Sequence, residues 1–435
     1  MPNRQKLANK VMGQPVGRTT PLAMLMRGFH SLRVRNYRLF ISGQAISLTG
    51  TWMQTTAQSW LVIRLTNSPF ALGLVAALQF LPVTILALYG GVLADRLPKR
   101  RTLVVTQTLL LIQAIIFGLL VATGMIQLWH VYILAVCQGM VNAIDIPVRQ
   151  AFSVEMVGRD ELPNAVALNS MTFNGARIIG PSLAGIIIAK IDIAPALFLN
   201  AISFVAVIVG LLMMRESELH TPTKRTQGSV RQQLADGLLY TWHTPKIMAV
   251  MIVVAAIGTF GYNFGVVLPL LANFVLHTDS AGFGLLSSFF GVGAFVAAIS
   301  TAYVKQVKMR RLLVGGGLFS VVLGAVSLSP IFGLSAALLA VLGAAGIIFT
   351  TSSNTLLQLT VPDELRGRVM SLNVLLIGGS TPIGGLLIGA MSNSLGVSAA
   401  LVTCAVLCLA GVIGAFVYER TPAFSRSETI PVVGE

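Results

Sequence analysis

Charged residues are scarce in this chain of 435 residues, since 15 are Asp or Glu and 30 are Lys or Arg, or 10% in all. Soluble domains carry about 25% charged residues, so this composition excludes a soluble enzyme. Cysteine is rarer still, with three residues, and His, Cys and acidic residues nowhere gather at the spacing of a metal site or a catalytic centre. We therefore expect no enzymatic activity, no bound metal and no cofactor.

Apolar residues, by contrast, make up 55% of the chain. A helix needs about 20 apolar residues to cross a bilayer. Runs of that length predict twelve helices, at 38–64, 70–94, 102–124, 130–149, 163–189, 194–214, 246–275, 281–304, 310–329, 331–359, 364–392 and 396–418. The predicted fold class is an all-α polytopic membrane protein.

Polar connections divide the chain into five segments. We expect a basic arm over 1–37, six-helix halves over 38–214 and 246–420, a linker over 215–245, and a tail over 421–435. The arm has no apolar core of signal-peptide length. Within the linker, apolar residues recur every four positions, at Val230, Leu234, Leu238 and Trp242. This pattern predicts a helix lying on the membrane surface, and a solvated linker is the alternative.

The two halves repeat short features at nearly constant offsets. Asp160-Glu161-Leu162 recurs as Asp363-Glu364-Leu365, Pro181 as Pro382, and Arg100-Arg101 as Arg310-Arg311, at offsets of 203, 201 and 210. Each match falls at the corresponding place in its half. We expect two halves related by a pseudo-two-fold axis along the membrane normal.

The basic residues give an orientation rather than a nucleic-acid surface. Of the 30, 27 fall in segments that the helix assignment places on one side, whereas Arg64 and Lys190 fall on the other and Arg177 lies within a helix. Lys and Arg near span ends resist translocation. We expect a multi-pass protein of the plasma or inner membrane with both termini cytoplasmic, in contact with anionic lipid and not with nucleic acid.

The loop from Gly90 to Arg101 resembles the signature between helices 2 and 3 of the major facilitator superfamily. The matching residues are Gly91, Leu93, Ala94, Asp95, Arg96, Lys99 and Arg100. The expected start of helix 11 lies at the same membrane level as Asp95, and a helix N-terminus attracts a carboxylate. We predict that Gly91, Asp95, Arg96 and Arg100 form a conformational latch that favours the outward-open state.

Helix 5 resembles the Gly-Pro signature of the antiporters of this superfamily, through Gly180, Pro181 and Gly185. Small residues let membrane helices approach closely, and Gly291 and Gly293 give helix 8 a complementary face. The resemblance implies an exporter, and ordinary small-residue packing is the alternative.

Charges within spans usually mark function or pairing. Here they are Asp145 and Arg149 on helix 4 and Arg177 on helix 5. At about 1.5 Å per residue, Asp145 and Arg177 both lie about 20 Å deep and could pair. Asp145 and Arg149, four residues apart on one helix, could pair instead. The superfamily's Arg before Gln138-Gly139 is replaced by Ala135, so its role in proton coupling does not carry over.

The resemblance to the superfamily also implies that helices 1, 4, 7 and 10 line a central cavity. The candidate lining residues are aromatic or amides, which suit a bulky amphipathic ligand better than a small anion: Trp52, Gln54, Gln58, Asn142, Phe260, Tyr262, Asn263, Phe264 and Asn354. We expect about a third of them to touch substrate.

The runs around Trp52, Asp145 and Asn174 are most similar to the enterobactin-exporter-like branch of drug-proton antiporters. That resemblance implies a monomeric transporter that exports a siderophore, drug or similar amphipathic compound, driven by the proton gradient. An importer of lysolipids or nutrients is the alternative within this fold. A receptor or scaffold that does not transport is the alternative of another class.

Overall fold

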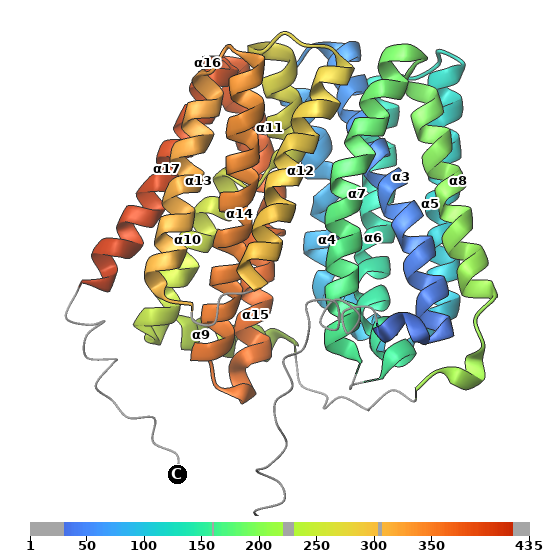
Figure 1. Cartoon of the computed structure of the whole chain (residues 1–435), viewed down its shortest axis with the longest axis horizontal. Coiled ribbons are helices and arrows are strands. Elements are labelled where there is room, and N and C mark those ends of the chain that lie inside the picture. The colour runs from blue at the N-terminus through green and yellow to red at the C-terminus, as the bar shows by residue number, and fades with distance from the viewer. Residues whose placement is uncertain (1–29, 159–160, 221–229, 303–306, 421–435) are drawn as a thin grey trace, which may run out of the picture.

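All regular elements in the described part of the chain are helices (Figure 1). The computed structural model describes residues 30–158, 161–220, 230–302 and 307–420, with the backbone but not the side chains of 87–96, 230–236, 302, 363 and 364. Helices satisfy their own backbone hydrogen bonds, which is the condition for crossing lipid. The predicted all-α class is confirmed.

The first half of the chain forms one group of helices, on the right of Figure 1. After η1 (His30–Arg33), α3 packs on α7 and α8, α4 on α6, and α5 on α6 and α8. The bounds are α3 (Arg35–Thr66), α4 (Pro69–Arg96), α5 (Lys99–Ala122), α6 (Leu128–Val157), α7 (Leu162–Lys190) and α8 (Ile193–Leu212).

The second half forms the group on the left of Figure 1, after η2 (Glu216–Glu218) in the linker. In this half α14 packs on α12 and α13, and α17 packs on α10, α13 and α16. The bounds are α9 (Val230–His243), α10 (Pro245–Phe260), α11 (Phe264–Leu270), the π-helical turn η3 (Leu271–Val275), α12 (Ser280–Ala302), α13 (Met309–Leu328), α14 (Phe332–Thr360), α15 (Asp363–Ile377), α16 (Thr381–Leu395) and α17 (Val397–Glu419).

We call proximal the end of the bundle at which α3 begins and α17 ends, and distal the opposite end (Figure 1). Among the described residues, ten helices are long and apolar enough to cross a membrane, or eleven if the bent pair Gly237–His243 and Pro245–Phe260 is one span. α3 is not among them, although it has 32 residues, because Gln, Ser and Thr side chains dilute its apolar content. Twelve spans therefore stay a prediction.

Two predicted helices of the second half are broken. The run expected over 246–275 stops at Phe260, is unwound at 261–263, and resumes at Phe264. The run expected over 364–392 stops at Ile377 and resumes after a turn over 378–380. Glycine weakens helix propagation, and proline is suited to a first turn. Gly261 accordingly lies in the first break. Gly378 and Gly379 lie in the second break, and Pro382 lies in the first turn of the helix that follows it.

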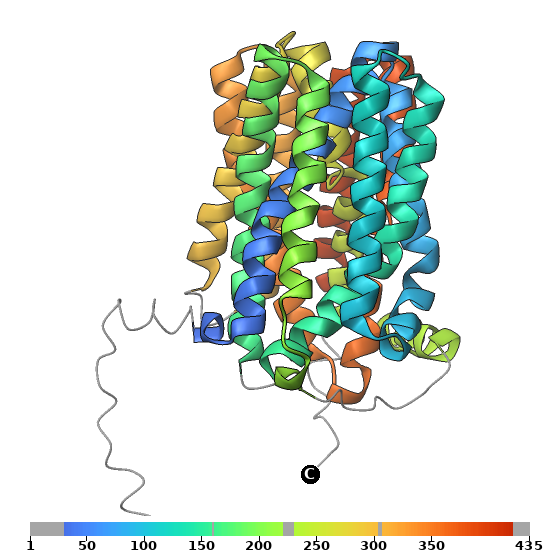
Figure 2. The same ribbon diagram turned by 90° about the vertical axis from the view of Figure 1, so that its right-hand side faces the viewer.

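The linker helix α9 turns by 109° relative to α10. It lies across the proximal end of the bundle rather than along it (Figures 1 and 2). Gly237 faces α15 at Arg368, where a Cβ would come within 3.1 Å of the Arg368 Cβ. Leu238, Leu239 and Trp242 are more than half exposed. The described part of α9 thus presents apolar side chains at the level of the helix ends.

Candidate functional site

The halves meet at the distal end through helices α7 and α12, which approach closely at glycines. A Cβ on Gly185 would come within 2.6 Å of the Ser280 carbonyl oxygen and 3.1 Å of the Gly284 Cα. Ser288 donates its hydroxyl to the Ile178 carbonyl at 3.0 Å and also contacts the Ser182 hydroxyl. Backbones this close exclude any larger side chain.

The predicted partners of the Gly-Pro motif are only partly right. Gly291 does face α7, at Ile178, but Gly293 faces the Ala340 carbonyl of α14. Gly180 faces α3 at Trp52 rather than α12. The residue that completes the contact with Gly185 is Gly284, which the sequence pattern did not single out.

A second pair of helices, α4 and α16, meets in the same way. A Cβ on Gly73 would collide with the Gly385 carbonyl oxygen, and one on Gly389 would lie 2.9 Å from the Pro69 carbonyl oxygen. Toward mid-depth the Thr84 hydroxyl reaches the Gly379 carbonyl at 3.4 Å. Two glycine contacts therefore join the halves at the distal end.

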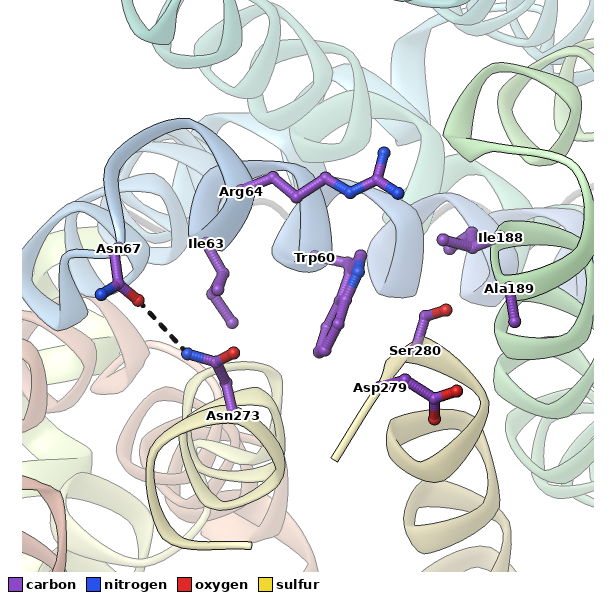
Figure 3. A pocket seen from close by; sticks show the side chains of 9 residues that line it. All are labelled: Trp60, Ile63, Arg64, Asn67, Ile188, Ala189, Asn273, Asp279 and Ser280. Atoms are coloured by element: carbon purple, nitrogen blue, oxygen red, sulfur yellow. Dashed lines mark hydrogen bonds between the residues drawn. The ribbon is translucent and has the colours of Figure 1, made fainter. Parts of the chain in front are cut away.

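Between these contacts, α3 closes the distal end against the second half. Trp60 is 8% exposed and stacks on Phe283 of α12, with ring centroids 6.0 Å apart. Asn273 of η3 donates to Asn67 at 3.4 Å, and the two side chains point toward each other in Figure 3. A pocket of about 550 Å³ lies here, and Trp60, Asn67, Asn273 and Ser280 are among the residues that line it.

Arg64 also lines this pocket but pairs within its own half. Its guanidinium lies 2.7 Å from Asp192, and both side chains are about half exposed. The backbone N–H of Ile193 and the Arg64 guanidinium hold the pKa of the Asp192 carboxyl below its usual value, against a smaller opposing effect of burial. An ion pair this exposed contributes little to stability.

One face of α7 shows where contact between the halves ends. The positions 170, 173, 177, 181, 184 and 188 share that face at helical spacing. The distal members Pro181, Ala184 and Ile188 are buried, whereas Ser170 and Phe173 are exposed. The half-buried Arg177 separates the two groups. The face is therefore closed distally and open proximally.

Arg177 reaches across to the second half. Its guanidinium carbon lies 4.5 Å from the centre of the Phe290 ring, and the Tyr262 side chain is a second neighbour from the same half. The Nη2 atom is buried without a hydrogen-bond partner. This charge lies 13 residues, or about 20 Å along a helix, from Lys190 at the distal end of α7.

The Arg177 side chain meets an aromatic group at the break between α10 and α11. Phe264 lies 4.0 Å from Phe290 and 5.2 Å from Tyr262, and Phe319 of α13 lies 6.0 Å from Phe264, all between ring centroids. Unwound backbone within a membrane is tolerated where it faces protein or a water-filled space. The break thus places Tyr262 and Phe264 opposite the first half at mid-depth.

The structure decides the pairing of Asp145 in favour of Arg149. The two side chains lie 3.4 Å apart, and the same carboxylate accepts hydrogen bonds from Thr106 at 2.6 Å and Gln107 at 2.9 Å. Asp145 is 1% exposed. The pair with Arg177 is wrong, because α6 turns Asp145 toward α5 while α7 turns Arg177 toward the second half.

Three predicted cavity residues are buried in this conformation. Gln54 is 1% exposed and shares hydrogen bonds with Gln113, Gln138 and Asn200 inside the first half. Gln58 donates to Gln79 at 3.3 Å. Asn263, in the break after α10, donates to the Thr259 carbonyl of that helix. Burial of amides requires such partners, so the expectation that these three face a cavity does not hold here.

The other predicted cavity residues are half-buried. Trp52 packs edge-on against Phe173, with centroids 5.7 Å apart, and Asn354 accepts a hydrogen bond from Asn373 at 2.7 Å. Asn142, Phe260, Tyr262 and Phe264 have intermediate exposure as well. Of this set, Tyr262 is a neighbour of Arg177, and Phe264 contacts Phe290, the ring over which Arg177 lies. Trp52 contacts Phe173, which shares the α7 face with Arg177.

The predicted latch falls mostly outside the described side chains, since those of Gly91, Asp95 and Arg96 belong to the range 87–96. Arg100 is described. It donates to the Leu211 and Leu212 carbonyls at 2.7 and 2.9 Å and pairs with Glu216 at 2.6 Å. In this conformation Arg100 ties α5 to the end of α8.

Sequence reasoning missed a buried ion pair at the proximal end. Lys99 and Glu155 lie 2.7 Å apart, 8% and 13% exposed, and join α5 to α6. It also missed Phe290, which lies on an apolar helix face with no distinguishing neighbours. The spacing of Gly73, like that of Gly284, was available as a small-residue signal.

The whole arrangement matches solved membrane transporters. A bacterial homologue of the human lysosomal transporter Spinster, in an inward-facing and unoccupied conformation, superposes with a TM-score of 0.71 over 91% of this chain and 99% of that chain. The sequences are 12% identical, so this likeness shows the fold alone. The class defined by fold and site is therefore an all-helical membrane protein with the fold of solved transporters.

The chain belongs to the transmembrane secretion effector family of the major facilitator superfamily, whose family model matches residues 26–432. It is 24% identical to the staphyloferrin A transporter of Staphylococcus aureus over 83% of this chain and 90% of the relative. It is 24% identical to the multidrug efflux pump Tap of Mycolicibacterium fortuitum, over 84% and 92%. It is 25% identical to the enterobactin exporter EntS of Citrobacter koseri, over 77% and 78%.

These comparisons confirm the resemblance to the superfamily and to its efflux branch. The protein is a multi-span membrane transporter of small molecules and not an enzyme.

Proposed function

We propose that this protein exports an amphipathic small molecule, of the siderophore or drug type, by alternating access coupled to proton antiport. Two relatives support the direction of transport, since one is a multidrug efflux pump and the other is an enterobactin exporter. The proposal places the transporter in the plasma or inner membrane as a monomer, in contact with lipid and protons.

The observation that carries this proposal is the unequal contact between the halves. The contacts of α4 with α16, of α7 with α12 and of α3 with η3 all lie at the distal end or near mid-depth. On the proximal side, six of the nine residues from 166 to 174 of α7 are exposed. A structure closed at one end and exposed at the other is one of the two states that alternating access needs.

The positions of the glycines support a pseudo-two-fold relation between two six-helix halves. Exchanging the halves turns the contact of Gly185 with Gly284 into that of Gly385 with Gly73. Gly385 follows Gly185 by 200 residues and Gly284 follows Gly73 by 211. These offsets lie within one residue of the offsets of 201 to 203 and of 210 between the repeated sequence features. Twelve spans follow if α3 and the broken runs each cross once.

Orientation and coupling complete the proposal. The proximal end carries Lys99, Arg100 and Arg215, which supports placing it, and both termini, in the cytoplasm. Asp145 is the acid within the spans and is our candidate for proton coupling together with Arg149. Asp95 is proposed to latch the proximal end shut in the outward-open state, with Gly91, Arg96 and Arg100.

The test is transport in cells with and without the protein. Labelled siderophores and amphipathic drugs should accumulate less when the protein is present, and a protonophore should abolish that difference. Protein that is inserted normally but carries Asp145→Asn serves as the matched control for coupling. Uptake of a ligand together with protons would reject export in favour of the importer.

A further inference from the structure

Arg177 is a cation within the membrane, and no carboxylate among the described side chains balances its charge. Asp145 is the one acidic residue of the sequence that falls inside a span rather than in a connection or at a helix end. The structure commits it to Arg149, Thr106 and Gln107. Among the described residues, no acidic side chain lies within ion-pair distance of Arg177. A charge left alone at this depth is costly and usually functional.

The neighbours of Arg177 leave part of its binding capacity unused. A cation over an aromatic ring is attracted by the quadrupole of the ring, and Phe290 supplies that contact. The buried Nη2 still lacks an acceptor. Guanidinium groups bind carboxylates with two parallel charge-assisted hydrogen bonds. Such a pair of bonds is stronger than the contacts that Arg177 makes with Phe290 and Tyr262.

Arg177 lies where the packed distal part of the α7 face meets its exposed proximal part. The side chain belongs to the face of α7 whose proximal members are exposed and whose distal members are packed. It comes from the first half, whereas Phe290 and Tyr262 come from the second. A ligand bound here would touch both halves at the point where their distal contact ends. Its binding energy would therefore depend on the relative position of the halves and could shift it.

We propose that Arg177 binds the carboxylate of an amphipathic anion, with the half-buried rings of Tyr262 and Phe264 receiving its apolar body. The inference rests on the proposed transport function and narrows its substrate class, since the same charge repels cationic compounds. The rings offer flat apolar surfaces that favour an aromatic or conjugated body.

The test is equilibrium binding to the purified full chain in nanodiscs of phosphatidylcholine, with two probes of one shape: pyrenebutyrate and its neutral amide. Wild type should bind pyrenebutyrate at least tenfold more tightly than Arg177→Gln does. The two proteins should bind the neutral amide with equal affinity. Arg177→Lys should retain part of the preference, because it keeps the charge without the planar fork. Lys190→Gln, which removes an exposed distal cation, is the matched control and should behave as wild type.

Several outcomes would overturn the proposal. Equal binding of carboxylate and amide by wild type, or unchanged carboxylate binding by Arg177→Gln that elutes as folded protein, would reduce Arg177 to a structural contact. Loss of the Arg177-dependent preference in phosphatidylglycerol nanodiscs would assign the site to lipid phosphate instead. Binding in nanodiscs needs no proton gradient, so it is measured independently of transport. If cells export ligands but the purified protein shows no preference for the carboxylate, this site alone is rejected. If the protein prefers the carboxylate but cells show no export, the proposed function alone is rejected.

Discussion

At the scale of single residues, Asp145 shows how the first half tolerates an acid in its interior. The carboxylate accepts two hydrogen bonds from α5 and faces Arg149 one turn along α6, which in turn donates to Gln44 of α3 at 2.8 Å. Each partner lowers the cost of burying the charge. Three helices of the first half are thus joined by one polar cluster.

A double-mutant cycle should report this pairing. Asp145→Asn and Arg149→Gln, alone and together, should show a coupling free energy of about 0.5 to 3 kcal/mol in unfolding. The cycle of Asp145→Asn with Arg177→Gln should show none, because Arg177 faces Phe290 instead. Unfolding in mixed detergent, followed by circular dichroism, gives the four free energies. Coupling to Arg177 as large as to Arg149 would contradict the structure.

At the scale of elements, the closest approaches between the halves are backbone contacts at glycines. Gly185 and Gly284 join α7 to α12, and Gly73 and Gly385 join α4 to α16. A contact without side chains depends on close approach, so it can form and part as a unit when the halves rock. We regard the two glycine contacts as the distal gate.

Enlarging Gly284 should therefore open that gate. Gly284→Val places methyl groups against the Pro181 carbonyl, and overpacking of this kind costs about 1 to 3 kcal/mol. That cost falls on the distally closed state and should shift the population toward the distally open one. Spin labels at Ile191 and Leu395, both exposed, should move apart. Gly175→Val is the control, since a Cβ there meets open space. An equal change in the distance between the labels in this control would show that overpacking at Gly284 is not the cause.

At the scale of the whole molecule, the predicted orientation assigns the distal end to the outside. The native cysteines give a low background for thiol labelling, because Cys404 and Cys408 are buried and Cys137 is half-buried within α6. Met125 is 66% exposed between α5 and α6 at the distal end, and Ser217 is exposed after α8 at the proximal end.

An impermeant thiol reagent should distinguish the two ends in intact cells. Met125→Cys should react from outside, and Ser217→Cys should react only after the membrane is made permeable. The reverse pattern would invert the topology. The basic residues of the proximal end would then lie outside, against the rule that places them in the cytoplasm.

The sequence by itself determined the membrane class and the family, because long apolar runs and the loop around Asp95 are local properties of the chain. It also placed most helix ends within a few residues, as at Pro69, Pro163 and Pro245, where proline favours a first turn. The break at Gly261 escaped it, because a glycine inside an apolar run is compatible with a continuous helix as well.

Only the tertiary structure decided which side chains meet. Periodicity gives the residues that share one face of a helix, but neither the rotation of that face nor its neighbour in space. Rotation of α3 buries Gln54 against Gln138 and Asn200, and rotation of α7 carries Arg177 away from Asp145 to Phe290. Depth alone made the two charges look like partners, and packing of the two halves separated them.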